Sequence, residues 1–129
     1  MELQVGVKAI LKNSKGQYLL ILRRKPLGGS IKWDIPGGRI DLSEHLEDAL
    51  RRELREEIGS DPEGLIRLLT AQDIILPESN LHVVRLTYVA EFNKEATLSE
   101  EHQDFRWVTK KEALSLDIDP YLRQPLEML

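Results

Sequence analysis

Residues 38–60 read GRIDLSEHLEDALRRELREEIGS, and this stretch decides the fold. Its large apolar residues recur every four positions, at Leu46, Leu50, Leu54 and Ile58. This spacing predicts an amphipathic helix whose apolar stripe packs on the rest of the protein. Gly59 is suited to end the helix, because the residue after a helix often adopts the left-handed conformation that glycine tolerates best.

The start of this helix is expected near residue 41. Asp41 and Glu44 have the spacing of a capping box, in which two residues satisfy each other's backbone N–H groups. Ser43 is the competing N-cap residue. In either case the helix is expected to begin before Leu46.

Acidic residues crowd the last turns of the expected helix. Glu53 lies three residues before Glu56 and four before Glu57. Like charges at these spacings cost about 0.2–0.5 kcal/mol each in an exposed helix. A divalent cation reverses this penalty, because Mg²⁺ and Mn²⁺ prefer clustered carboxylate oxygens. Crowding also raises the pKa of one carboxyl group, which suits a general base.

The alternative to a metal site is an ordinary solvated face. Arg52 and Arg55 lie among the glutamates and can neutralise them as surface ion pairs. Arg52 lies four residues before Glu56 and can orient that side chain by charge-assisted hydrogen bonds. The acidic residues alone do not decide between these readings.

The flanking pattern predicts mostly strands. Strands are expected at 3–11, 18–22, 33–35, 81–92 and 105–108, with one bent strand or two at 65–76. Thr109 and Glu112 form a second capping box that opens a helix through 116, and a final helix is expected at 119–129. This order of elements predicts an α+β or α/β sandwich with a mixed sheet.

Composition narrows the class of protein. The 129 residues fit one domain, 1–129, and the absence of cysteine excludes disulfides, zinc–thiolate sites and thiol nucleophiles. The formal net charge of −4 argues against binding to a nucleic-acid polymer. Neither a signal peptide nor an apolar run long enough to span a membrane is present. We therefore expect a cytoplasmic protein.

The same stretch resembles the Nudix box. Gly38 is followed after five residues by Glu44, and after seven more by Arg-Glu-Leu-Arg-Glu-Glu-Ile-Gly at 52–59. Ser60 departs from the family, which usually has an aliphatic residue there. The segments 33–38 and 101–107 also look like the flanks of the box in that family.

The resemblance implies an α/β/α sandwich and an enzyme that hydrolyses a nucleoside diphosphate linked to another moiety. It implies Mg²⁺, with Mn²⁺ as a substitute, held by Glu56, Glu57 and the carbonyl of Gly37. Glu53 falls where the family has a ligand or general base. Arg52 falls where the family orients these glutamates.

Further site residues follow from the resemblance less directly. Glu101 fits the place of an additional carboxylate from a late loop, with Glu100 as the alternative, and a solvated loop charge is the competing reading for both. Glu44 is a fixed box position whose role is catalytic or only local, completing the capping box. Four residues are candidates for substrate binding: Arg23, Trp33, Gly38 and Phe105. Arg23 would contact phosphates, and the two aromatic rings would stack on a base unless they belong to the core.

The box does not choose the substrate. The short chain resembles the MutT-type nucleoside triphosphate pyrophosphohydrolases, which release a monophosphate and pyrophosphate. Hydrolysis of ADP-ribose or nucleotide sugars is the alternative activity. A non-catalytic nucleotide-binding module and a structural domain with an acidic docking helix are alternatives of other classes. The expected partner is a small nucleotide, and the chain is expected to be a monomer or a homodimer.

Overall fold

The computed structural model describes residues 1–23, 31–99 and 102–129, and for Arg23, His102 and Gln103 the backbone alone. Its strands are β1 (Glu2–Lys12), β2 (Tyr18–Arg23), β3 (Trp33–Asp34), β4 (Gly37–Arg39), β5 (Glu63–Leu76), β6 (Leu81–Glu91) and β7 (His102–Val108). Its helices are α1 (Leu46–Ile58), α2 (Lys110–Ser115) and α3 (Arg123–Glu127), with a 3₁₀ turn at Pro77–Ser79. No helix in the described part of the chain is both long and apolar enough to cross a bilayer.

The strands form one mixed sheet, as the sequence predicts. Along its main path the order is β3-β2-β1-β6-β5, while β4 pairs with β1 and β7 pairs with β2. The long strands β1 and β6 run parallel over their whole length, and the other pairings are antiparallel. A parallel pair needs a crossover connection, and α1 lies within the one between β1 and β6.

The sheet opens between β1 and β2. These two strands form a hairpin, with Lys12 and Tyr18 as its paired residues. Beyond that pair, β3 lies along β2 and β4 lies along β1. The chain from Trp33 to Arg39 thus fills the opening and leads directly into the loop before α1, which positions its glycines inside the sheet.

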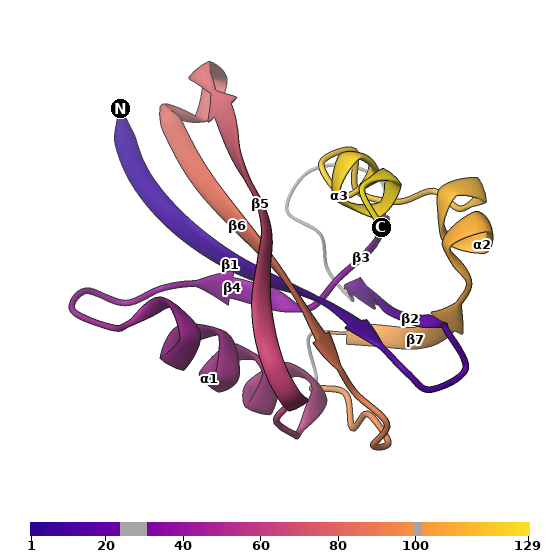
Figure 1. The fold of residues 1–129 in the computed structure, drawn as a ribbon. Coiled ribbons are helices and arrows are strands. Elements are labelled where there is room, and N and C mark those ends of the chain that lie inside the picture. Colours follow the sequence, from indigo (N-terminus) through magenta and orange to yellow (C-terminus); the bar gives the residue numbers. More distant parts are fainter. Residues whose placement is uncertain (24–30, 100–101) are drawn as a thin grey trace.

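Helices cover both faces of the sheet (Figure 1). The α1 face contains a core cluster that includes Val7, Ala9 and Leu11 of β1 together with Leu50 and Leu54 of α1. A second cluster on the other face joins Ile10 and Leu20 to Ala113, Leu122 and Leu126 from the C-terminal helices. Neighbouring residues of β1 thus serve opposite cores, as the alternation of a strand requires.

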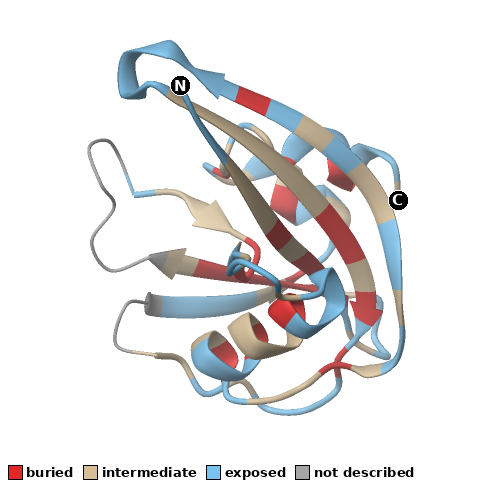
Figure 2. Cartoon of the chain, turned by 90° about the vertical axis from the view of Figure 1, so that its left-hand side faces the viewer, coloured by how far each residue is buried: buried red, intermediate tan, exposed pale blue. Residues whose placement is uncertain are grey.

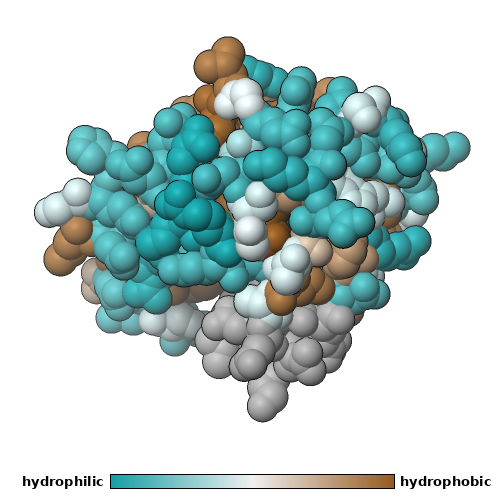
Figure 3. Space-filling model, turned by 90° about the horizontal axis from the view of Figure 1, so that it is seen from below, coloured by the Kyte–Doolittle hydropathy of each residue, from teal (hydrophilic) through white to brown (hydrophobic). Residues whose placement is uncertain are grey.

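The apolar stripe of α1 is confirmed except at its first position. Ala49, Leu50, Leu54 and Ile58 are fully buried, whereas Leu46 remains 38% exposed. Figure 2 shows the buried residues of α1 on the side that faces the sheet. The hydrophilic residues of this helix lie outward, and hydrophilic side chains cover most of the face seen from below (Figure 3).

The expected start of α1 is wrong. The helix begins at Leu46, and its N-cap residue His45 makes no side-chain capping bond. Ser43 has φ +66, a left-handed conformation that an N-cap residue does not adopt. Glu44 still accepts from the N–H of Asp41, so one half of the expected capping pair forms within the loop. The expected end is confirmed, since Gly59 has φ +78.

The remaining elements follow the sequence with three corrections. The short strand β4 was not expected, and β7 begins at His102 instead of residue 105. The stretch 65–76 is a single strand with two register shifts against β6, and the capping box of Thr109 and Glu112 is complete. The final helix is much shorter than 119–129, because α3 covers only Arg123–Glu127. Asp119 and Pro120 instead precede it in a turn, where Asp119 binds the backbone N–H of Tyr121.

Two leucines of α1 provide a matched test of this packing. We expect Leu50→Ala to lower the free energy of unfolding by about 2–5 kcal/mol, because it leaves a cavity in a fully buried site. Leu46→Ala, at the exposed end of the same stripe, should cost less than about 1 kcal/mol. Urea unfolding followed by circular dichroism measures both values. Equal losses would contradict the position of the stripe.

Candidate active site

The guanidinium of Arg52 is the centre of the candidate site. Its Nε and one terminal nitrogen hold the carboxylate of Glu44 at 2.7 and 2.9 Å. Its other nitrogen donates to Glu53 at 2.9 Å and, more weakly, to Glu56 at 3.4 Å. A further bond at 3.0 Å reaches the carbonyl of Arg39 at the end of β4. One side chain therefore ties α1 to the loop before it and to the sheet.

These bonds change the acidity of Glu44. Its bidentate bond to Arg52 and the N–H of Asp41 stabilise the carboxylate and lower its pKa to about 2. Glu44 is thus a permanent anion that holds Arg52. The expected contact between Arg52 and Glu56 exists, but the shorter bonds of Arg52 go to Glu44 and Glu53.

Two glycines allow α1 to approach the sheet closely. Gly37 has φ +147, and a Cβ there would collide with the carbonyl of Val7. A Cβ on Gly38 would collide with the carboxyl group of Glu53. The N–H of Gly37 donates to Glu57 at 2.7 Å. Glu53 therefore fills the space that a side chain at Gly38 would occupy, and Glu57 lies against the backbone N–H of Gly37.

Burial raises the pKa of Glu57 to about 7. The cation of Lys8 and the N–H of Gly37 oppose this rise, and the nearby anions of Glu53 and Asp34 add a smaller one. Burial is also the largest cause of the raised pKa of Glu53. Crowding of like charges, which the sequence suggests as the cause, thus contributes less than removal from water.

Lys8 and Asp34 belong to the site although the sequence analysis did not select them. Lys8 donates to Asp34 and to the carbonyl of Ile35, each at 3.2 Å. The pair lies where β1 meets the segment that leads into Gly37. A signal was available in the strand pattern, since Lys8 is a charged residue two positions before the buried Ile10 and on the same face.

The C-terminal end of α1 is capped by a distant loop. The backbone N–H groups of Thr97 and Ser99 donate to the carbonyls of Ile58 and Glu57, at 2.9 and 3.0 Å. The side chain of Thr97 also packs on Gly59. The segment 93–99 therefore fixes the helix end that carries the acidic residues.

The acidic residues are chemically suited to bind a cation, but their side chains are not arranged as a complete metal site. Within 1–23, 31–99 and 102–129, no three acidic or histidine side chains converge as a metal centre. Arg52 draws Glu53 and Glu56 toward itself, while Glu57 turns to Gly37. Each of these three carboxylates keeps one oxygen that no described residue binds. Hard oxygen donors of this kind fit Mg²⁺ or Mn²⁺.

Trp33 and Phe105, the two aromatic residues predicted to bind substrate, lie on opposite faces of the sheet. Trp33 packs with the C-terminal helices, and the guanidinium of Arg106 lies 5.9 Å from its ring centre. Phe105 precedes Arg106 on β7, so its side chain points to the opposite face. The side chain of Arg23 and all of Glu100 and Glu101 lie outside the described residues, and their predicted roles stay predictions.

The raised pKa of Glu57 predicts how stability depends on pH without metal. Since the folded protein binds this proton more tightly than the unfolded chain, stability is greatest below the unfolded pKa and falls as pH rises toward about 7. We expect the Tm of metal-free protein to fall between pH 5 and pH 8, and Glu57→Gln to flatten this decrease. If Tm depended on pH in the same way in the unaltered protein and in Glu57→Gln, the burial of Glu57 would be contradicted.

The fork geometry of Arg52 gives a second prediction. Lysine keeps the charge but cannot bind Glu44 with two parallel bonds. In Arg52→Lys the pKa of Glu44 should rise from about 2 toward its ordinary value, as followed by NMR titration of its side-chain carboxyl carbon. Arg51→Lys, one residue earlier on the same helix, serves as the control. A Glu44 pKa unchanged in Arg52→Lys would contradict the assignment.

Comparison with known proteins identifies the family of the chain. The family model described as NUDIX domain matches residues 2–129. A protein of Escherichia fergusonii named nucleoside triphosphatase NudI is 32% identical over 111 residues, which is 75% of each chain. One of the same name from Enterobacter sp. is 31% identical over 126 residues, covering 88% of this chain and 87% of that one. The crystal structure of a MutT NUDIX hydrolase from Burkholderia pseudomallei superposes with a TM-score of 0.87 at 29% identity, covering 100% of this chain and 99% of that one.

The match over nearly the whole chain agrees with the glycines, the Arg52 centre and the half-buried glutamates of the structure. The chain belongs to the NUDIX domain family and is a Nudix hydrolase.

Proposed function

We propose that the chain hydrolyses nucleoside triphosphates to a monophosphate and pyrophosphate, as one catalytic domain that needs Mg²⁺ or Mn²⁺. The observation that carries this proposal is the placement of Glu53 and Glu57 against Gly37 and Gly38. Two half-buried carboxylates beside exposed Glu56 form an anionic centre that a cation can complete. The names of the relatives, nucleoside triphosphatases, support the choice of substrate.

Glu56, Glu57 and the carbonyl of Gly37 would hold the cation. When bound, the cation polarises phosphoryl oxygens and neutralises charge on the phosphates. Glu56 is 59% exposed at its side chain and has room to turn from Arg52 toward a ligand. Glu57 is already fixed by the N–H of Gly37, so it needs little rearrangement.

Glu53 is the proposed general base. Its side chain is only 15% exposed, and burial raises its pKa, which makes its carboxylate a better proton acceptor. The bond from Arg52 holds one of its oxygens, and the other faces Gly38. Arg52 thus positions Glu53, and Glu44 in turn positions Arg52.

Substrate contacts are proposed for Gly38, Trp33 and Arg23. Gly38 has no side chain, and a phosphate is proposed to approach its backbone beside the carboxyl group of Glu53. Trp33 is half-buried beside β2 and can stack on a base by the part of its ring that Arg106 does not cover. Arg23 ends β2, one residue beyond the pair of Leu22 with Trp33, and is proposed to contact phosphates.

The test is turnover by purified protein with Mg²⁺ or Mn²⁺. The panel contains canonical and oxidised nucleoside triphosphates, ADP-ribose, nucleotide sugars and dinucleoside polyphosphates. Glu57→Gln and Glu56→Gln should each lower kcat about 100-fold or more, because even outer-shell partners of a metal contribute 10–100-fold. Glu53→Gln should lower kcat more than it weakens Mn²⁺ binding. EDTA should abolish turnover.

Glu47→Gln is the matched control. Glu47 lies in the first turn of α1, where it contacts Arg51 at 4.0 Å and is away from β4. Its turnover should equal that of the unaltered protein. If ADP-ribose alone were turned over, the chain would still be a hydrolase, but ADP-ribose would replace nucleoside triphosphates as its substrate. Silence across the panel, from folded protein that still binds Mn²⁺, would favour a nucleotide-binding module instead.

A further inference from the structure

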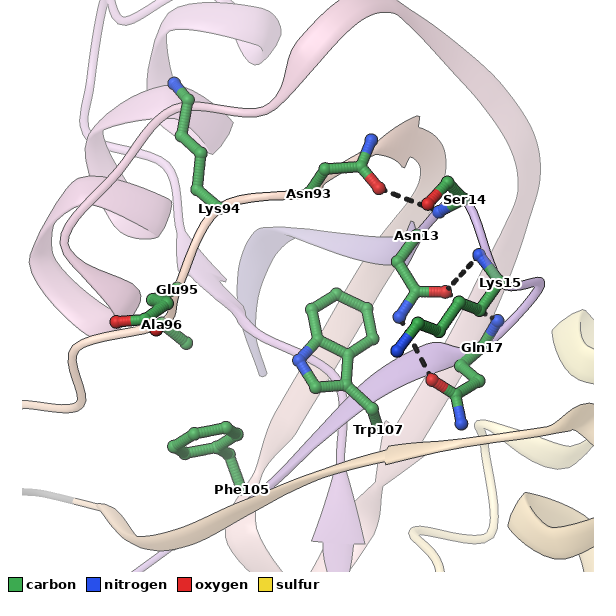
Figure 4. Close-up of a pocket in the computed structure, with 10 residues that line it drawn as sticks. All are labelled: Asn13, Ser14, Lys15, Gln17, Asn93, Lys94, Glu95, Ala96, Phe105 and Trp107. Atoms are coloured by element: carbon green, nitrogen blue, oxygen red, sulfur yellow. Dashed lines mark hydrogen bonds between the residues drawn. The ribbon is translucent and has the colours of Figure 1, made fainter.

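A pocket of about 560 Å³ opens beside β7, away from the box residues. Its described lining comes from the β1–β2 turn, the segment after β6 and two side chains of β7, namely Asn13, Ser14, Lys15, Gln17, Asn93, Lys94, Glu95, Ala96, Phe105 and Trp107. None of these residues lies within 38–60. The volume falls in the range of small-molecule sites. Figure 4 shows the two aromatic rings in the pocket, with the amide side chains beside them.

The two aromatic residues form a rigid platform. Phe105 and Trp107 alternate along β7 and therefore point to the same face of the sheet. The buried ring of Phe92 stacks on the indole of Trp107, with ring centres 6.2 Å apart and planes at 19°. One side of the indole is thus supported by the core, and Phe105 is 37% exposed. A planar ring from solution can extend this stack.

The polar groups of the pocket favour a ligand with an acceptor and an anion. The indole N–H of Trp107 donates to no described residue and, in Figure 4, points toward the side formed by Ala96 and Phe105. Lys15 forms no ion pair with a described carboxylate. Lys94 binds the carbonyl of Asp61, lies near the carboxylate of Glu63 and extends away from the two rings in Figure 4. Glu95 is the one acidic residue among the described lining residues of the pocket. Lys15 is therefore the cation of the described lining that can meet an anionic group beside the rings.

The pocket is connected to the catalytic helix by the chain itself. Its wall at 93–96 continues into Thr97 and Ser99, whose N–H groups bind the last carbonyls of α1. A ligand that orders this wall also restrains the segment that holds Glu57. Its occupation is thus placed to affect turnover without contact with the reacting phosphates.

We infer that this pocket binds a nucleoside monophosphate, with the base on Trp107 and Phe105 and the phosphate near Lys15. The stacking surface accepts any base, because every base has a π face. The inference goes beyond the proposed activity and does not depend on it, since a monophosphate contains no diphosphate linkage to cleave.

The experiment uses the fluorescence of Trp107. Trp33→Phe leaves Trp107 as the only tryptophan of the chain. AMP added to this variant in EDTA should give a saturable change of its emission, with adenosine binding more weakly. Adding Phe105→Ala should weaken AMP at least about tenfold, in line with ~1–3 kcal/mol for base stacking. Adding Lys15→Glu should weaken AMP and leave adenosine unchanged, and Lys94→Glu, at a side chain that extends away from the rings, is the matched control.

Glu57→Gln in the same background, titrated with AMP both in EDTA and in Mn²⁺, separates this pocket from the catalytic site. It should leave the AMP titration unchanged, because Glu57 does not line the pocket. Circular dichroism verifies that each variant is folded. No saturable change with AMP, a change that persists in both the Phe105 and the Lys15 variants, or one lost in Glu57→Gln would each overturn the inference. None of these outcomes bears on the hydrolase activity, which is measured as turnover.

Discussion

The geometry of the site depends on the guanidinium of Arg52. A guanidinium offers its N–H groups in one rigid plane, and here they reach α1, the loop at Glu44 and the β4 carbonyl of Arg39. Without this cation, Glu44, Glu53 and Glu56 would repel one another on adjacent turns and across the loop. The same bonds leave the acidic residues with an excess of negative charge. The ion-pair network therefore stabilises the fold while preserving attraction for a further cation.

The opening between β1 and β2 gives these charges their environment. The chain from Trp33 to Arg39 lies in that opening, and its glycines bring the backbone against α1. A carboxylate placed there loses most of its water, which is why burial dominates the pKa of Glu57. Lys8 lies close enough to limit this rise. Close backbone approach, rather than the number of glutamates, thus determines the acidity of the site.

Sequence patterns predicted those structural features that depend on residues close together in the chain. The stripe of α1, its end at Gly59 and the capping box of Thr109 depend on spacings of a few residues, and all three are confirmed. Contacts between distant segments could not be predicted in this way. They include the pairing of β4 with β1, the exposure of Leu46 and the opposite faces of Trp33 and Phe105. The predicted start of α1 is wrong because residue type alone favours Asp41 and Ser43 as N-cap residues. In the structure Arg52 holds Glu44 outside the helix.

The C-terminal end of α1 explains how acidic residues are tolerated where a helix usually disfavours them. Unpaired carbonyls carry the negative end of the helix dipole. In α1 the carbonyls of Arg55, Glu57 and Ile58 accept N–H groups from Gly59, Ser99 and Thr97. These donors bring partial positive charge to the helix end and reduce the repulsion on Glu56 and Glu57. The segment 93–99 therefore contributes to the electrostatics of the site as well as to its shape, although none of its side chains belongs to the Nudix box.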